Sequence, residues 1–172
     1  MVGKEEVRPV AVLVITCLVW GALLGLTHSA TEKRIEEAER AELYRTLSQI
    51  FPSAQFKEEN GYYTCWENGV LVGYAVEVEE RGYGGKMRVL VGALPDGTVA
   101  GVRILSHGET PGLGARVTEE AFLEQFRGKE LGGVVLKKDG GEIEGVTGAT
   151  ISSRAVVRAV RSGLENLLRW ME

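Results

Sequence analysis

The chain has 172 residues, enough for one domain and a small additional segment. Its formal net charge of −4 argues against a nucleic-acid-binding surface. The two cysteines, Cys17 and Cys65, are too few for a disulfide-stapled domain, and with only two histidines no cluster has the spacing of a metal site. The 23 glycines are typical of a domain with many turns, which favours strands.

An uncharged apolar segment lies near the N-terminus. Residues 9–31 contain no Asp, Glu, Lys or Arg, and at about 1.5 Å per residue a helix of this length spans the roughly 30 Å hydrocarbon core of a membrane. We therefore predict a transmembrane anchor over residues 1–30. A buried helix of a soluble protein and a cleaved signal peptide are the alternatives; the apolar run is longer than the signal-peptide core of ~7–15 residues. Basic residues alone do not set the orientation.

The next segment has the pattern of an amphipathic helix. From Thr31 to Ile50, apolar residues recur near one face and Glu and Arg fill the others. Thr31 is placed to cap this helix and Pro52 to end it. The pattern predicts a helical stalk over residues 31–52, followed by a domain over residues 53–172.

From Tyr62 the apolar period changes to two, which is typical of strands. Asn68-Gly69 separates the first two strand-like runs, and this dipeptide is a strong hairpin signal. Cys65 falls within the first of these strands, where burial is expected rather than reactivity. A second pair surrounds residues 95–97. The four predicted antiparallel strands are Tyr62–Trp66, Val70–Glu79, Lys86–Ala93 and Thr98–Leu105.

Two glycine-containing loops stand out in the second half. Residues 82–85 read Gly-Tyr-Gly-Gly and present an exposed aromatic side chain, Tyr83. Residues 107–114 form a loop longer than a simple connection needs, and such loops often bind ligands; a plain turn is the alternative. His107 is expected to hydrogen-bond within this loop. After it, Thr118 is expected to begin a short helix that runs to Phe126.

The end of the chain is predicted to close the sheet and then form a helix. Val134–Lys138 and Glu142–Val146 have strand-like composition around a glycine turn. The helix follows from Thr150, with free N–H groups at its start that suit an anion such as a phosphate. Simple capping by Thr150 or Ser152 is the alternative. The apolar stripe of this helix comprises Val156, Val160, Leu164, Leu167 and Met171.

The turn before this helix resembles a known signature. Residues 144–150 read Glu-Gly-Val-Thr-Gly-Ala-Thr. This is similar to the FMN-binding domain family, found in the G subunit of the Rnf electron-transport complex and the C subunit of the sodium-pumping quinone reductase. In that family the last Thr carries FMN through a phosphoester, so the resemblance implies Thr150 as the attachment residue. Glu144 departs from the family's usual Asp, which weakens the match to a flavin-transferase recognition site.

The other two loops carry the same resemblance. The run His-Gly-Glu-Thr-Pro-Gly-Leu-Gly at residues 107–114 is similar to the family's segment that lines the isoalloxazine pocket, and residues 82–85 match its Gly-Tyr-x-Gly loop. The resemblance implies that side chains of this segment contact the ring or ribityl chain, and that N–H groups near Gly112 and Gly114 face the reduced flavin. The implied cofactor-binding residues are Tyr83, Glu109, Thr110, Gly112, Leu113, Gly114, Thr147, Gly148, Ala149 and Thr150.

The resemblance also implies a fold and a function. The fold expected is α+β, with a transmembrane helix and a stalk helix before an antiparallel-sheet FMN-binding domain with flanking helices. The sequence has neither a nicotinamide fingerprint nor the cysteine pattern of an iron–sulfur cluster. We therefore expect an electron-relay subunit of a ferredoxin:NAD oxidoreductase, with covalent FMN and no activity alone.

The partners expected are the other membrane subunits of the Rnf complex and a flavin transferase, with the soluble domain on the extracytoplasmic side of the cytoplasmic membrane. A compact length favours the G subunit of Rnf over the C subunit of the quinone reductase. A freestanding membrane-anchored flavin carrier and an anchored domain that never receives flavin are the alternatives.

Overall fold

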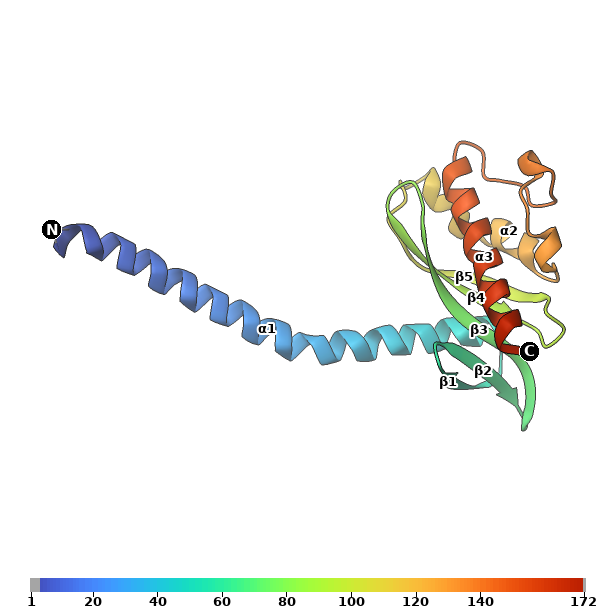
Figure 1. The fold of residues 1–172 in the computed structure, drawn as a ribbon, viewed down its shortest axis with the longest axis horizontal. Coiled ribbons are helices and arrows are strands. Elements are labelled where there is room, and N and C mark those ends of the chain that lie inside the picture. The colour runs from blue at the N-terminus through green and yellow to red at the C-terminus, as the bar shows by residue number, and fades with distance from the viewer. Residues whose placement is uncertain (1–3, 172) are drawn as a thin grey trace. The chain divides into compact units, whose positions relative to one another are not determined.

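The computed structural model describes residues 4–171. The chain divides into two compact units, Met1–Glu42 and Leu43–Glu172. One long helix, α1 (Lys4–Ile50), forms the first unit and contributes its last turns to the second (Figure 1). The predicted helix start at Thr31 is wrong. The Thr31 hydroxyl instead donates to the carbonyls of Thr27 (2.8 Å) and His28 (3.1 Å) within the continuous helix, because no Gly or Pro interrupts the backbone there.

The part of α1 in the first unit exposes its apolar side chains. Val12–Ile50 is long enough, and contains a stretch apolar enough, to cross a membrane, and none of that apolar stretch is buried. The amphipathic pattern predicted from Thr31 is satisfied only at the end of the helix: Ile35 is exposed, whereas Leu47 is fully buried. The large apolar side chains exposed in the first unit are Val10, Val12, Leu13, Val14, Ile15, Leu18, Val19, Trp20, Leu23, Leu24, Leu26 and Ile35.

The second unit contains one antiparallel sheet of five strands in sequence order. The four predicted strands are confirmed, and the hairpin turn at Asn68 (φ 50°) and Gly69 (φ 79°) has the backbone that an Asn-Gly turn favours. The first strand was not predicted; it pairs with the second through a like turn at Asn60 and Gly61. The strands are β1 (Gln55–Glu59), β2 (Tyr62–Glu67), β3 (Val70–Arg81), β4 (Lys86–Ala93) and β5 (Val99–His107).

The prediction of two further strands near the end of the chain is wrong. Within residues 4–171, their only ladder contact is an isolated parallel bridge between Leu136 and Ile143, flanked by the 3-10 turns Leu131–Gly133 and Lys137–Asp139. The Lys137 N–H donates to the Ile143 carbonyl (2.8 Å), and Gly140 has a left-handed φ of 90°. Because Leu136 and Ile143 are both buried in the core, the segment folds back on itself instead of extending the sheet.

The helix predicted from Thr118 to Phe126 is instead a series of short turns. A 3-10 turn (Gly114–Thr118) is followed by α2 (Glu120–Leu123) and a second 3-10 turn (Glu124–Phe126). Thr118 does not begin the helix, because its hydroxyl donates back to the Ala115 carbonyl at 2.9 Å. This series of turns places its apolar side chains in the larger of the two hydrophobic cores, which also contains the buried residues of the last helix.

The last helix, α3 (Thr150–Met171), packs across β3 and β4 (Figure 1). Its predicted stripe is confirmed, since Val156, Val160, Leu164 and Leu167 are fully buried, and Met171, the last member, is partly buried against the same core. Adjacent residues of β4 face opposite sides of the sheet: Val91 joins the core under α3, while Leu90 joins a smaller core. The sheet therefore has a packed layer on each face.

The smaller core includes the end of α1 and the predicted buried thiol. Leu43, Leu47, Ile50 and Phe51 pack there with Cys65, which is fully buried. Burial raises the pKa of the Cys65 thiol to about 12, because an apolar surrounding disfavours the charged thiolate. The prediction that Cys65 is buried within its strand is confirmed.

Candidate functional site

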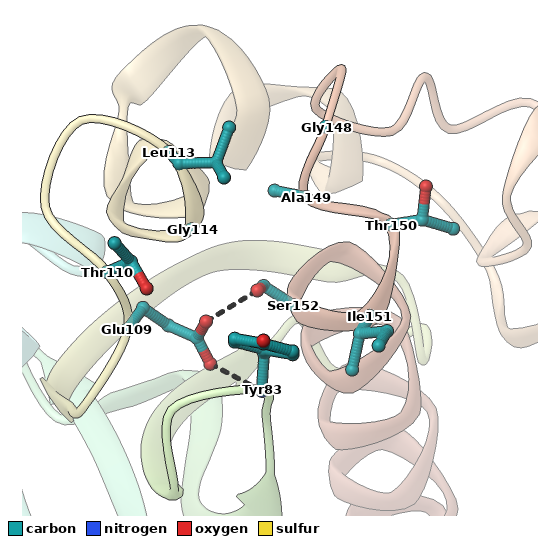
Figure 2. A pocket seen from close by; sticks show the side chains of 10 residues that line it. All are labelled: Tyr83, Glu109, Thr110, Leu113, Gly114, Gly148, Ala149, Thr150, Ile151 and Ser152. Carbon is teal, nitrogen blue, oxygen red and sulfur yellow. Dashed lines mark hydrogen bonds between the residues drawn. The ribbon is translucent and has the colours of Figure 1, made fainter.

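A pocket of about 520 Å³ opens where three segments of the second unit meet. The turn between β3 and β4 forms one wall, the loop after β5 forms the second, and the start of α3 with the turn before it forms the third (Figure 2). The lining residues are Tyr83, Glu109, Thr110, Leu113, Gly114, Gly148, Ala149, Thr150, Ile151 and Ser152. Three segments that are far apart in sequence, from Tyr83 to Ser152, thus share one concave site.

The pocket gathers most of the residues that the sequence singled out. Two are exceptions. Thr147 lines a smaller cavity of about 90 Å³, which shares Gly148 and Thr150 with the larger pocket, and Gly112 has no atom within 4 Å of the position that a Cβ would occupy. Two lining residues, Ile151 and Ser152, were not predicted as ligand contacts. Their position in the first turn of α3, directly after Thr150, was the signal that could have indicated them.

Three exposed apolar side chains surround the opening. Tyr83 is 71% exposed, Ile151 53% and Leu113 47%. Figure 2 shows Leu113 and Ala149 across the pocket from Tyr83 and Ile151. Apolar surface gathered around one concavity is typical of a ligand-binding site. The geometry therefore suits an aromatic ring system placed between these walls.

A buried serine holds the turn that precedes α3. The Ser153 hydroxyl accepts the Val146 N–H (3.0 Å) and donates to the Ala149 carbonyl (2.9 Å). Gly148 has a φ of 79°, a conformation that glycine adopts without strain. A Cβ on Gly148 would lie 2.8 Å from Leu113 Cδ1. The turn is thus fixed from within and packs against the loop that forms the opposite wall.

The small cavity brings a cation next to Thr150. The Lys138 Nζ lies 3.4 Å from the Thr150 Oγ1. The next residue, Asp139, is held to the helix by Arg154 through two hydrogen bonds of 2.7 and 3.1 Å. This guanidinium lowers the pKa of the Asp139 carboxyl. Thr150 therefore lines both the larger pocket and the small cavity, and the Lys138 ammonium lies beside its hydroxyl.

The N-terminus of α3 adds hydrogen-bond donors on the same side. The Ser153 N–H makes the first backward bond, to the Ala149 carbonyl at 2.9 Å, so the preceding N–H groups of the helix have no carbonyl of their own to bind. Such N–H groups and the positive end of the helix dipole favour an anion. Lys138 was not predicted for this role, because only the folded chain brings it beside Thr150.

The acidic residue of the motif is presented to solvent. The Gln125 side chain holds the backbone of Glu144 in both directions, accepting its N–H at 2.8 Å and donating to its carbonyl at 3.2 Å. The Glu144 side chain remains largely exposed and lies 3.3 Å from Lys137 Nζ. An exposed carboxylate on a fixed backbone is accessible to a partner protein.

The loop after β5 is fixed by its own polar groups. The Glu109 N–H donates to His107 Nδ1 at 3.2 Å, which confirms the hydrogen bond expected of His107 within its loop. The Glu109 carboxylate is buried and accepts from the Tyr83 N–H at 2.8 Å and the Ser152 hydroxyl at 2.6 Å (Figure 2). The Glu109 side chain, which belongs to the second wall, thus binds both of the other walls.

Comparison with known proteins defines the class. Residues 82–165 match the FMN-binding domain family, and residues 5–50 match the RnfG N-terminal region. The first match covers all three loops of the pocket, and the second covers α1. The chain is therefore a member of the class of proteins that join an RnfG-type N-terminal helix to an FMN-binding domain.

Whole-chain relatives identify the family. Over 95% of both chains, the protein is 32% identical to the G subunit of the ion-translocating oxidoreductase complex of Methanosarcina acetivorans. Over 90% of its length, it is 32% identical to the G subunit of the proton-translocating ferredoxin:NAD(+) oxidoreductase complex of Clostridium ljungdahlii, of which 88% is covered. The protein belongs to this family, the G subunits of Rnf-type ion-translocating oxidoreductase complexes, as its motifs predicted.

Solved structures agree on the fold. NqrC of Shewanella oneidensis is 23% identical and superposes with a TM-score of 0.54 over 69% of each chain. The C subunit of the Na(+)-translocating NADH-quinone reductase from Parabacteroides distasonis is 22% identical, with a TM-score of 0.54 over 64% of this chain and 61% of that one. The predicted α+β fold class is confirmed.

Proposed function

We propose that this protein carries FMN attached through a phosphoester to Thr150 and acts as an electron relay within its complex. The observation that supports this best is the position of the Thr150 hydroxyl. Thr150 lines both the apolar pocket and the small cavity, and its hydroxyl lies 3.4 Å from the Lys138 ammonium. A cofactor with a flat ring at one end and a phosphate at the other needs such a junction.

The residues present fit FMN at both ends. Tyr83, Leu113 and Ile151 offer apolar surface to the isoalloxazine, and the pocket volume of about 520 Å³ lies in the usual range for ligand sites. Lys138 and the N-terminus of α3 would oppose the phosphate charge. When bound, FMN supplies the electron transfer, and the protein supplies orientation and electrostatics.

The covalent step needs a transferase and an activated donor. The Thr150 Oγ would hold the flavin phosphate as a phosphoester, and the transferase would supply the flavin in an activated form. The exposed Glu144 carboxylate, on a backbone held by Gln125, is the element that we propose the transferase recognises. Covalent attachment would keep the cofactor on the protein outside the cytoplasm.

The membrane anchor completes the proposal. The exposed apolar side chains of α1 suit a lipid surrounding better than water, and we place the FMN-binding domain on the extracytoplasmic side. Because the sequence has no nicotinamide fingerprint and no iron–sulfur cysteine pattern, we assign the oxidation of ferredoxin and the reduction of NAD to other subunits. A freestanding flavin carrier is the second candidate, and copurification with several polytopic membrane proteins would argue against it.

The test is the intact mass of the protein purified from its native membrane, with flavin fluorescence in a denaturing gel. We expect wild type to exceed its sequence mass by one FMN less one water. Thr150→Ala should lose this increment, whereas Thr118→Ala, at a threonine that lines neither cavity, should keep it. An unmodified wild-type chain from cells with an active flavin transferase, or an increment retained in Thr150→Ala, would contradict the proposal.

A further inference from the structure

We infer that Glu109 is a positioning residue with two effects: its carboxylate holds the three walls of the pocket together, and its charge lowers the reduction potential of the flavin. The first effect stands on the structure of the chain alone. The second rests on the proposed function, because it requires a flavin in the pocket. The resemblance to the FMN-binding family implied only that Glu109 is a cofactor contact.

The hydrogen bonds of Glu109 reach both neighbouring walls. Its Oε1 accepts the N–H groups of Tyr83 (2.8 Å) and Gly84 (3.3 Å) in the turn between β3 and β4. Its Oε2 accepts the Ser152 hydroxyl (2.6 Å) at the start of α3. Since Glu109 itself belongs to the loop after β5, one side chain joins all three walls.

The backbone has closed around this carboxylate without room for other side chains. A Cβ on Gly82 would overlap with Glu109 Oε1, and a Cβ on Gly114 would lie 2.5 Å from Glu109 Oε2. A Cβ on Gly84 would overlap with the Gly108 carbonyl. Gly82 and Gly114 are therefore needed because any larger residue would collide with the Glu109 carboxylate, and Gly84 because a larger residue would collide with the loop that carries Glu109.

The side chain of Glu109 is buried among groups that can donate hydrogen bonds. Glu109 is 5% exposed, and all three of these hydrogen-bond partners can act as donors: two backbone N–H groups and one hydroxyl. The 2.6 Å separation from the Ser152 oxygen is in the range of a hydrogen bond to a charged oxygen. Among the residues that the structure describes, no lysine or arginine forms an ion pair with Glu109.

A fixed charge at this place acts on a bound ring. Glu109 lines the same pocket as Tyr83, Leu113 and Ile151, which form the proposed ring surface. Because Glu109 is only 5% exposed, water screens its charge weakly, and a carboxylate without a cationic partner disfavours the arrival of further negative charge. Electrons added to the flavin therefore meet a repulsion that a neutral side chain would not produce, and the reduction potential is lowered.

Two substitutions separate the charge from the hydrogen bonds. Glu109→Gln keeps the shape: its amide oxygen can accept the Tyr83 and Gly84 N–H groups, while its NH₂ donates to the Ser152 oxygen. Glu109→Ala removes both the bonds and the charge. The full chain is purified in detergent, and thermal unfolding, flavin content and flavin reduction potential are measured for each variant. Glu119→Gln, an exposed carboxylate paired with Arg116 outside the pocket, is the control.

We expect Glu109→Gln to unfold near the wild-type temperature and to show a more positive potential. Glu109→Ala should lower the melting temperature by about 5 °C or more, because it leaves buried donors without a partner. Ser152→Ala, which removes one bond, should fall between the two in stability. The Glu119→Gln control should change neither the potential nor the melting temperature.

The outcomes distinguish the two effects. An unchanged or more negative potential in Glu109→Gln would overturn the electrostatic effect, and wild-type stability in Glu109→Ala would overturn the bracing effect. If wild type carries no flavin by mass, the proposed function fails instead, while the melting temperatures of the flavin-free chains still test the bracing.

Discussion

Two sets of glycines in this domain meet different physical needs. At the hairpin tips, Gly61 and Gly69 have left-handed φ values of 91° and 79°, and nothing lies within 4 Å of the position of a Cβ. Around the pocket, Gly82, Gly84 and Gly114 do not have left-handed φ values, but a Cβ on any of them would collide with Glu109 or with the facing loop. The first set is needed because its backbone is left-handed. The second set is needed because a side chain would collide with neighbouring atoms.

This difference shows how the pocket is constructed. Hairpin turns need a glycine because of the local backbone twist, which is independent of the rest of the fold. The pocket glycines let loops that are distant in sequence come into backbone contact. The loss of stability when one of them is replaced therefore depends on the tertiary structure. Gly148 belongs to both sets, since its φ is 79° and a Cβ there would meet Leu113 at 2.8 Å.

Gly84→Ala should have the largest effect. The added methyl group would overlap with the Gly108 carbonyl, a backbone atom that cannot rotate away, so the two loops must separate. We expect a loss of about 3 kcal/mol in the free energy of unfolding, as for severe overpacking. The measurement is urea unfolding of the full chain in detergent, followed by tryptophan fluorescence. The visible spectrum of the flavin should also change, because two pocket walls move.

Gly61→Ala is the matched control. The substitution adds the same methyl group to a glycine with open space around it, so only the left-handed backbone is strained. We expect a loss of about 1 kcal/mol and an unaltered flavin spectrum. Equal losses in Gly84→Ala and Gly61→Ala would show that the two sets of glycines do not differ as the structure indicates.

Gly148→Ala should have an intermediate effect, expressed in flavin attachment. The substitution strains the turn that places Thr150, and about 1.4 kcal/mol of strain at that step would slow attachment roughly tenfold. Adding Leu113→Ala removes the close contact of 2.8 Å that the new methyl group would make with Leu113, but it leaves the backbone strain. The double variant should therefore recover part of the rate. Mass spectrometry of samples taken during flavinylation measures this, and no recovery would show that backbone strain alone accounts for the loss.

Features encoded locally were predictable from the sequence. The Asn68-Gly69 dipeptide fixes a hairpin through its backbone preference, and the stripe of α3 follows from helical periodicity. β1 was missed although Asn60-Gly61 carries the same signal, because Phe56 is the only apolar residue between Gln55 and Glu59, so no alternation is visible.

Features set by tertiary packing were not predictable in this way. Residues 134–146 have the composition of a hairpin, but burial of Leu136 and Ile143 in the core under α3 outweighs pairing with the sheet. The motif residues of the pocket were found because they are contiguous in sequence. Lys138 and Gln125 were not, because each reaches the motif only through the fold.

Lys138→Met should have the smallest effect, and it tests the site without adding a methyl group to any glycine. Lys138 lies 3.4 Å from the Thr150 hydroxyl but is exposed, so its charge is screened and contributes only about 0.2–1 kcal/mol. We expect flavin attachment to slow about two- to fivefold, with the difference from wild type shrinking as salt is added. Stability should not change, because the side chain covers no core.

The control for this variant is Lys57→Met, which removes an exposed lysine paired with Glu59 on β1. It changes the net charge by the same amount but lies on a strand that does not line the pocket. If Lys57→Met slows attachment as much as Lys138→Met, the effect comes from net charge and transferase encounter. If only Lys138→Met slows attachment, the cation acts at the Thr150 phosphate. On that side of the turn, the charge of Lys138 rather than close packing then affects the rate of attachment.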